Sequence, residues 1–89
     1  MEIIYLPKAG EDLEFWIKTG NKLILKKIAQ LTEAIILDPH KGPGKPEALK
    51  HQLTGKWSRR INKEHRFVYT IIETNLYVYS LKGHYLNKP

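Results

Sequence analysis

Residues 56–82 read KWSRRINKEHRFVYTIIETNLYVYSLK, and this stretch decides the fold of the chain. It contains three segments suited to β-strands, 56–61, 66–72 and 76–82, in which β-branched and aromatic residues are frequent. Polar residues fill the two short connections between them, and short connections join antiparallel neighbours. In the first segment Trp57, Arg59 and Ile61 alternate with polar residues, as in a half-buried strand. The stretch therefore predicts an antiparallel meander of three strands.

Upstream of the meander, the sequence predicts one further strand and a first helix. Residues 2–6 are β-branched and aromatic, which favours a short strand that Pro7 ends. Residues 8–19 then place Leu13, Trp16 and Ile17 at helical spacing. Gly20 follows them as a C-terminal stop, because glycine adopts the left-handed conformation that commonly ends a helix.

A second helix has the clearest periodicity in the chain. Its apolar residues fall on one stripe, as expected for an amphipathic helix packed on a core: Ile24, Ile28, Leu31 and Ile35. Asn21 precedes the stripe as a candidate N-cap. The pair Asp38-Pro39 ends the helix, since the residue before a proline disfavours the helical region.

Between this helix and the meander the sequence predicts less regular structure. Residues 40–46 contain two glycines and two prolines and predict a loop, whereas residues 47–53 suit either one or two helical turns or irregular structure. The resulting order is strand, helix, helix and then three strands. It predicts an α+β fold with a mainly antiparallel sheet and two helices packed on one of its faces. A chain of 89 residues predicts a single domain over 1–89.

The composition excludes several classes of protein. Hydrophobic residues make up 42% and charged residues 27%, which is ordinary for a soluble globular domain. The longest apolar run has four residues, far short of the ~20 that a membrane span needs, and no signal-length apolar segment opens the chain. The absence of cysteine excludes disulfides and thiolate sites and fits a cytoplasmic protein. The four histidines lack the spacing of a metal motif, so we expect no metal and no cofactor.

Positive charge is concentrated in one part of the chain. Residues 41–66 hold eight basic and two acidic residues, a balance of +6, whereas the other 63 residues hold seven of each. Binding of a polyanion to such a surface releases condensed counterions from each phosphate that is neutralised. The segment therefore predicts binding to nucleic acid.

Several residues in and after this segment suit cleavage of RNA through its own 2′-hydroxyl. That reaction needs a base, an acid for the leaving 5′ oxygen and cations for the charge on phosphorus. Glu47 is a candidate base and His84 a candidate acid, with Tyr85 beside it for stacking or hydrogen bonding. The cations that could contact phosphate are Lys45, Lys50, Arg59, Arg60 and Arg66, of which the arginines could do so bidentately.

Each of these residues also has a structural interpretation. A glutamate in a basic loop is more often a salt-bridge partner than a base. Arg59 and Arg60 on a strand are more often a solvated face, and a histidine and a tyrosine near a C-terminus usually pack or lie at the surface. No single residue among them specifies a nuclease.

Taken together, four motifs resemble the YoeB/Txe branch of the RelE toxin superfamily. They are GKPEALKH at 44–51, LTGKWSRRI at 53–61, EHRFVY at 64–69 and His-Tyr at 84–85. The similarity extends over nearly the whole chain, including the first strand and the two helices. Members of this family are small bacterial toxins that enter the ribosomal A site and cut messenger RNA, leaving a 2′,3′-cyclic phosphate.

The resemblance implies specific roles and partners. It makes Glu47 the general base, His84 the general acid and Arg66 the group that stabilises transition-state charge. Tyr85, Lys50 and Arg60 take supporting positions. The implied partners are the 70S ribosome with its messenger RNA and a YefM-type antitoxin whose acidic, disordered tail covers the basic site. The implied assembly is a toxin homodimer or a toxin–antitoxin complex.

Two other functions remain open at this level. One is a non-catalytic module that binds RNA or the ribosome, for which the cations suffice. The other is a gyrase-inhibiting toxin of the same superfamily. Neither needs a carboxylate base together with an acid at the end of the chain, so the set of Glu47, Arg66, His84 and Tyr85 separates the nuclease from both.

Overall fold

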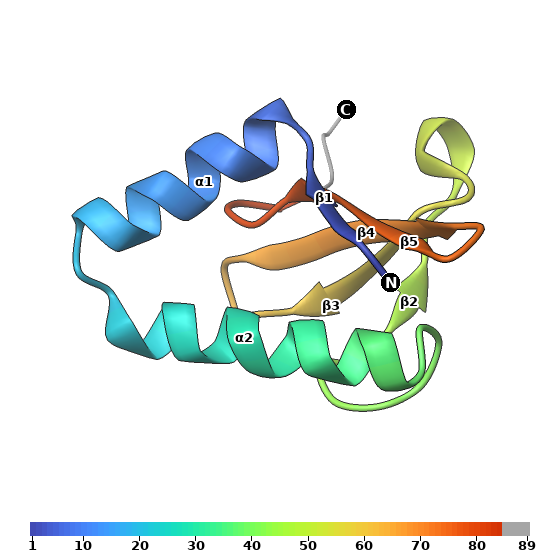
Figure 1. Cartoon of the computed structure of the whole chain (residues 1–89), viewed down its shortest axis with the longest axis horizontal. Coiled ribbons are helices and arrows are strands. Elements are labelled where there is room, and N and C mark those ends of the chain that lie inside the picture. Colours follow the sequence, from blue (N-terminus) through green and yellow to red (C-terminus); the bar gives the residue numbers. More distant parts are fainter. Residues whose placement is uncertain (85–89) are drawn as a thin grey trace.

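The computed structural model describes residues 1–84 as two helices on a five-stranded sheet (Figure 1). The elements, in chain order, are β1 (Ile3–Tyr5), α1 (Pro7–Lys18), α2 (Lys22–Leu37), β2 (Glu47–Ala48), the 3₁₀ helix η1 (His51–Leu53), β3 (Trp57–Arg60), β4 (Arg66–Ile72) and β5 (Asn75–Ser80). The strand order across the sheet is β1-β5-β4-β3-β2. β1 pairs in parallel with β5, and all other pairs are antiparallel. The predicted α+β fold is confirmed.

The two helices form a hairpin whose ends follow the sequence signals. Gly20 has a φ of 67° and its N–H donates to the carbonyl of Ile17, so it ends α1 as predicted. The Asn21 side chain accepts a hydrogen bond of 3.2 Å from the N–H of Ile24, which caps α2. Pro7 differs from its predicted role only in detail, because it is the first residue of α1, where its missing N–H costs nothing.

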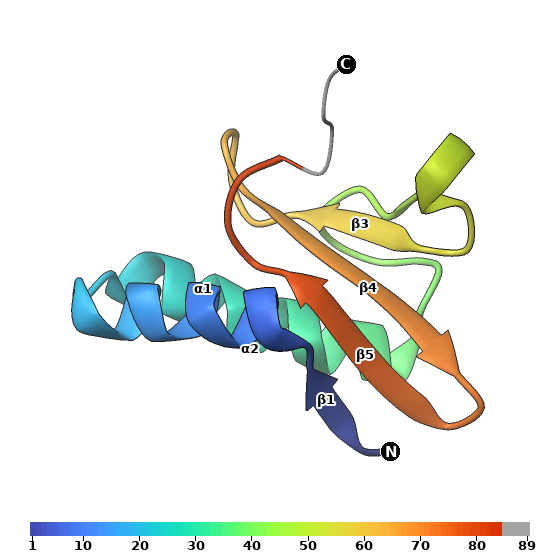
Figure 2. The ribbon, with the colours of Figure 1, turned by 90° about the horizontal axis from the view of Figure 1, so that it is seen from above.

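One core fills the space between the helices and the sheet. Figure 1 shows α1 and α2 as the two arms of a hairpin, and in the view of Figure 2, where the helices overlap, β4 and β5 run obliquely to them. The whole predicted stripe of α2 is buried there together with Ala9 and Trp16 of α1. The sheet contributes mainly Phe67, Tyr69, Leu76 and Val78, all without exposed surface. The other face of β2, β3 and β4, called the uncovered face below, is therefore not covered by α1 and α2, although Ser58 and Val68 on it are buried, with 2% and 4% of their surface exposed.

The sequence predicts helical turns or irregular structure over residues 47–53, and this is wrong for residues 47 and 48. Glu47 and Ala48 form a strand, β2, which pairs with Ser58 and Trp57 of β3, and only residues 51–53 make a single helical turn. A strand of two residues has no periodicity of its own. Its pairing depends on the loop before it, which is fixed by tertiary contacts.

Neither α1 nor α2 combines the length and the apolar composition that crossing a bilayer requires, and these are the α-helices within residues 1–84.

Candidate active site on the uncovered face

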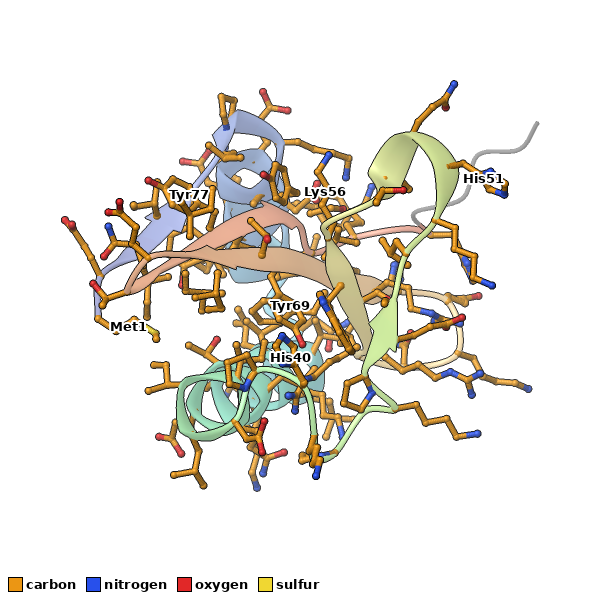
Figure 3. All side chains as sticks on the ribbon, turned by 90° about the vertical axis from the view of Figure 1, so that its right-hand side faces the viewer. Met1, His40, His51, Lys56, Tyr69 and Tyr77 are labelled. Atoms are coloured by element: carbon orange, nitrogen blue, oxygen red, sulfur yellow. The ribbon has the colours of Figure 1, made fainter. Side chains whose placement is uncertain are left out.

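A row of four side chains crosses the sheet on the face opposite α2. Glu47 is paired with Ser58, Ser58 with Val68 and Val68 with Ser80. Directly opposed residues in antiparallel strands point to the same face, so this row lies on one side of the sheet. Figure 3 shows the two sides: Lys56 and Tyr77 lie on this face, whereas Tyr69 and His40 lie toward α2. The sequence-predicted base is thus on the uncovered face.

A pair of arginines occupies the same face two residues further along. Arg60 on β3 is directly opposed to Arg66 on β4. Two like charges in this arrangement destabilise a sheet unless an anion lies between them. The Arg66 guanidinium is oriented through Nη1, which donates to the carbonyls of Asn62, Lys63 and His65 at 2.9, 3.2 and 3.2 Å. Nη1 of Arg66 is therefore held by the carbonyls of this turn.

Glu47 is exposed on this face and is not paired with a neighbouring cation. Among residues 1–84 its carboxylate belongs to no ion pair within 4.0 Å. Its backbone is fixed on both sides, because the Gly44 carbonyl accepts from Arg60 at 2.7 Å and Leu49 donates to Lys56 at 2.9 Å. The structural interpretation of Glu47 as a salt-bridge residue is therefore wrong for the described part of the chain.

Lys45 and Lys50 flank Glu47 in sequence, and both are exposed. Lys45 has a φ of 51°, in the left-handed region, directly after Gly44 with a φ of 86°. These two residues turn the chain into β2. Lys50 precedes η1 and follows the buried Leu49. Both lysines are thus exposed cations next to β2 in the chain.

His84 follows β5 and reaches the same region. The carbonyl of its neighbour Gly83 accepts a hydrogen bond of 3.0 Å from the N–H of Arg66. His84 is exposed and borders a hollow of about 240 Å³. The other residues that line this hollow are Lys8, Leu53, Lys56, Val68, Tyr79 and Ser80. The predicted acid therefore enters the uncovered face from the β4–β5 side, and the predicted Tyr85 lies outside the described residues.

Arg59 requires a correction. It has no exposed surface, and it points to the α2 side of the sheet. Its guanidinium donates to the carbonyls of Asp38, Lys41 and Pro43 at 2.6, 2.9 and 3.2 Å, and its Nε donates to the Tyr69 hydroxyl at 3.1 Å. A guanidinium buried in this way cannot reach a phosphate, so the prediction that Arg59 contacts RNA is wrong.

Arg59 and Tyr69 instead fasten the loop that leads to β2. The Tyr69 hydroxyl donates to the Pro39 carbonyl at 2.6 Å. Burial raises the pKa of Tyr69, an effect that the Arg59 guanidinium opposes. The hydroxyl thus remains a donor at neutral pH. The loop carbonyls accept their hydrogen bonds from the buried side chains of Arg59 and Tyr69.

His65 is a residue near the site that sequence reasoning missed. Its Nδ1 accepts a hydrogen bond of 2.8 Å from the Gly83 N–H, directly before the predicted acid. Its ring meets the Trp16 ring edge-on, with centroids 4.8 Å apart. The sequence indicates only a polar turn at 62–65, because both contacts come from residues far away in the chain.

The uncovered face thus combines acid–base groups with anion-binding groups. Glu47 supplies a carboxylate, His84 an imidazole, and Arg60 and Arg66 two guanidinium groups. Within residues 1–84, no three histidine, aspartate or glutamate side chains come together as a metal site would require.

Comparison with known proteins yields one family. Residues 5–85 match the family model described as YoeB-like toxin of bacterial type II toxin-antitoxin system. Toxin YoeB of Synechocystis sp. is 51% identical over 85 residues, which cover 96% of this chain and 98% of that protein. Toxin YoeB of Escherichia coli K12 is 41% identical, with 96% and 100% covered.

Solved structures agree with the sequence relatives. The YoeB/ParE toxin from Agrobacterium tumefaciens has a TM-score of 0.91 at 38% identity, covering 96% of this chain and 100% of that one. A YoeB dimer from Staphylococcus aureus and a heterotetrameric YoeB–YefM toxin–antitoxin complex from the same species each have a TM-score of 0.86 at 42% identity. Each covers 96% of this chain and 98% of the other.

Proposed function

Since this chain belongs to the YoeB-like toxins of bacterial type II toxin–antitoxin systems, as its motifs predicted, we propose that it is a ribosome-dependent endoribonuclease that cuts messenger RNA in the ribosomal A site. One observation carries the proposal. Glu47 and the opposed pair Arg60 and Arg66 share the uncovered face of the sheet, and His84 enters that face beside Arg66.

The proposed reaction uses the 2′-hydroxyl of the substrate as nucleophile. The Glu47 carboxylate accepts the proton of this hydroxyl, and the oxygen forms a bond to the adjacent phosphorus. The bond from phosphorus to the 5′ oxygen then breaks as His84 donates a proton to that oxygen. Arg66 stabilises the added negative charge on the phosphorane, with Arg60, Lys45 and Lys50 in support. The products are a 2′,3′-cyclic phosphate and a free 5′-hydroxyl.

Two features of the site support these roles. An exposed carboxylate without an ion-pair partner in the described chain can accept a proton from a substrate, whereas a salt-bridged one would first have to be released. The Arg66 guanidinium is held by turn carbonyls before any substrate binds. A preoriented cation stabilises developing charge without a further ordering cost.

Dependence on the ribosome follows from how open the site is. β2 and β4 are two strand spacings apart, roughly 10 Å, so Glu47 and Arg66 are separated along the same face of the sheet. The 2′-hydroxyl already lies next to the phosphorus that it attacks, so what remains to be supplied is the in-line alignment of the attacking and leaving oxygens. The A site of the 70S ribosome would supply that alignment by holding the message, and the reaction would then take place in the cytoplasm.

The proposed partner is a YefM-type antitoxin. The S. aureus relative forms a heterotetrameric complex with YefM and also a dimer. In this chain the surplus positive charge lies in 41–66, the segment that carries Glu47, Arg60 and Arg66. An acidic antitoxin segment that orders on binding would place carboxylates where RNA phosphates bind, so antitoxin and message should compete.

The decisive test is cleavage of a defined message on purified ribosomes. Wild-type protein should cut within the A-site codon and leave a 2′,3′-cyclic phosphate on the upstream fragment. Tight ribosome binding without any cut would support the non-catalytic binding module instead. Inhibition of DNA gyrase with an intact message would support the gyrase-inhibiting class.

A further inference from the structure

The segment that presents His84 is fastened to the rest of the molecule on two sides. From α1, the Asp12 carboxylate accepts from the Leu81 N–H at 3.0 Å, and the Trp16 indole donates to the Leu81 carbonyl at 3.0 Å. From β4, Gly83 is held through both of its backbone groups. His84 is thus the first residue after a fixed turn.

The β4 side of this attachment depends on one titratable side chain. The Gly83 N–H donates to His65 Nδ1 at 2.8 Å, and the Gly83 carbonyl accepts from the N–H of Arg66 at 3.0 Å. Only a ring nitrogen with a free lone pair accepts a hydrogen bond, so His65 is neutral here and carries its proton on Nε2. Its side chain is 18% exposed, with Trp16 against one side of the ring. The ring therefore has a fixed orientation.

We propose that His65 is a positioning residue for His84. Its neutral imidazole holds Gly83 through Nδ1 and so fixes the direction in which His84 leaves β5 and faces the substrate. This inference rests on the proposed nuclease function, in which His84 is the general acid. His65 itself need not touch RNA.

The same contact makes the position of His84 sensitive to pH. Protonation of His65 places a second N–H against the Gly83 N–H, and the hydrogen bond breaks. Burial lowers the pKa of His65 below its usual 6.5. Of the charged groups around it, Glu64 and Asp12 act to raise this pKa, whereas Lys82 and Arg66 act to lower it. A lowered pKa in the folded state means that the attachment is intact above pH 6.5 and weakens as the pH falls below it.

A pair of amide variants separates positioning from general packing. In His65→Asn the side-chain oxygen lies near the former Nδ1 and can accept from Gly83 without titrating. In His65→Gln the amide lies one carbon further out, near the former Nε2. We expect His65→Asn to cleave ribosome-bound message within about threefold of wild type at pH 7.5, and His65→Gln to be slower by roughly 10–100-fold, because misplacement by about 1 Å costs about that much. Ribosome binding should be unchanged in both.

The pH profile supplies a second readout. Wild-type cleavage should fall as the pH is lowered below 6.5, and His65→Asn should lose less over the same range. If thermal melting shows that His65→Gln does not fold, the comparison of wild type with His65→Asn still decides the matter. Equal rates for the two amide variants with parallel pH profiles would overturn the inference while wild type still cleaves. Absence of cleavage by wild type would overturn the nuclease proposal itself.

Discussion

Arg59 and Arg60 are neighbours in sequence with opposite surroundings, because successive residues of a strand point to opposite faces. Arg59 is completely buried and binds the carbonyls of Asp38, Lys41 and Pro43, whereas Arg60 is exposed opposite Arg66. The pair offers a matched test of which cation holds the fold and which one meets RNA.

We predict that Arg59→Met destabilises the protein far more than Arg60→Met. Arg59→Met removes the donor to the loop carbonyls and to the Tyr69 hydroxyl. Because these buried acceptors lose their hydrogen bonds, the free energy of unfolding should fall by about 2–4 kcal/mol. Arg60→Met should change it by less than about 0.5 kcal/mol but weaken ribosome binding. Urea denaturation measures the first effect and ribosome co-sedimentation the second. Similar losses of stability in both variants would refute the assignment of Arg59 to the core.

For single residues, the sequence predicts which side chains have suitable chemistry better than it predicts which groups surround them in the fold. Glu47, Arg60 and Arg66 are predicted from the sequence as a carboxylate among cations, and all three lie on the uncovered face. The burial of Arg59 could not be predicted, since alternation along β3 places it with Trp57 and Ile61 but does not reveal the loop carbonyls that accept from it. His65 was missed for the same reason, because its partner Gly83 lies 18 residues away.

The element that decides the position of Glu47 is the loop before β2. It is held from the core by Arg59 and Tyr69, and Gly44 lies against α2 and β3. A Cβ on Gly44 would meet the Leu31 side chain at 3.0 Å, Arg59 Cβ at 3.1 Å and the Arg60 carbonyl at 3.2 Å. Gly44 also has a φ of 86°, in the left-handed region. Both the close packing and this backbone conformation favour glycine at position 44 over any residue with a side chain.

We therefore predict that Gly44→Ala lowers the free energy of unfolding by roughly 1–3 kcal/mol and slows cleavage, because the loop must shift and carries Glu47 with it. Gly10→Ala is the matched control. Gly10 lies inside α1 with nothing within 4 Å of a new Cβ, so the change should raise stability by about 0.5–1 kcal/mol. Thermal denaturation of both variants measures the contrast. A Gly44→Ala protein as stable as Gly10→Ala would contradict the close packing of this loop.

The two helices, β1 and the meander were predicted from local signals, and the two-residue strand β2 was not. The stripe from Ile24 to Ile35 and the Asn21 cap were sufficient to predict α2, and the turns around the meander were sufficient for β3, β4 and β5. β2 exists because the loop contacts bring Glu47 opposite Ser58. A pattern of two residues contains no information about such a pairing.

Over the whole molecule, the surplus positive charge lies in the same segment of the chain as Glu47, Arg60 and Arg66. The surplus of +6 lies in 41–66, which contributes β2, β3 and the start of β4, whereas the lysines of α2 lie elsewhere on the fold. Neutralising three lysines in either region changes the net charge equally. Only the position of the neutralised charge then distinguishes the two variants.

We predict that replacing Lys41, Lys45 and Lys56 with glutamine weakens ribosome binding and flattens its salt dependence. The slope should fall by roughly 0.7–0.9 for each phosphate that the variant no longer neutralises, because fewer counterions are released on binding. The same replacement of Lys22, Lys26 and Lys27 on α2 should change the slope less. Binding measured across a series of salt concentrations provides the slopes. Equal changes in the two triple variants would mean that RNA does not select the uncovered face.

The central claim is that the carboxylate on the uncovered face is the base that starts messenger cleavage. Single-turnover cleavage of a defined message on programmed ribosomes tests it most directly, with Glu47→Gln compared with Glu73→Gln, an exposed glutamate in the turn between β4 and β5. We expect Glu47→Gln to cleave about 10²–10⁴-fold more slowly while still binding ribosomes, and Glu73→Gln to match wild type. Cleavage by Glu47→Gln at the wild-type rate would contradict the account.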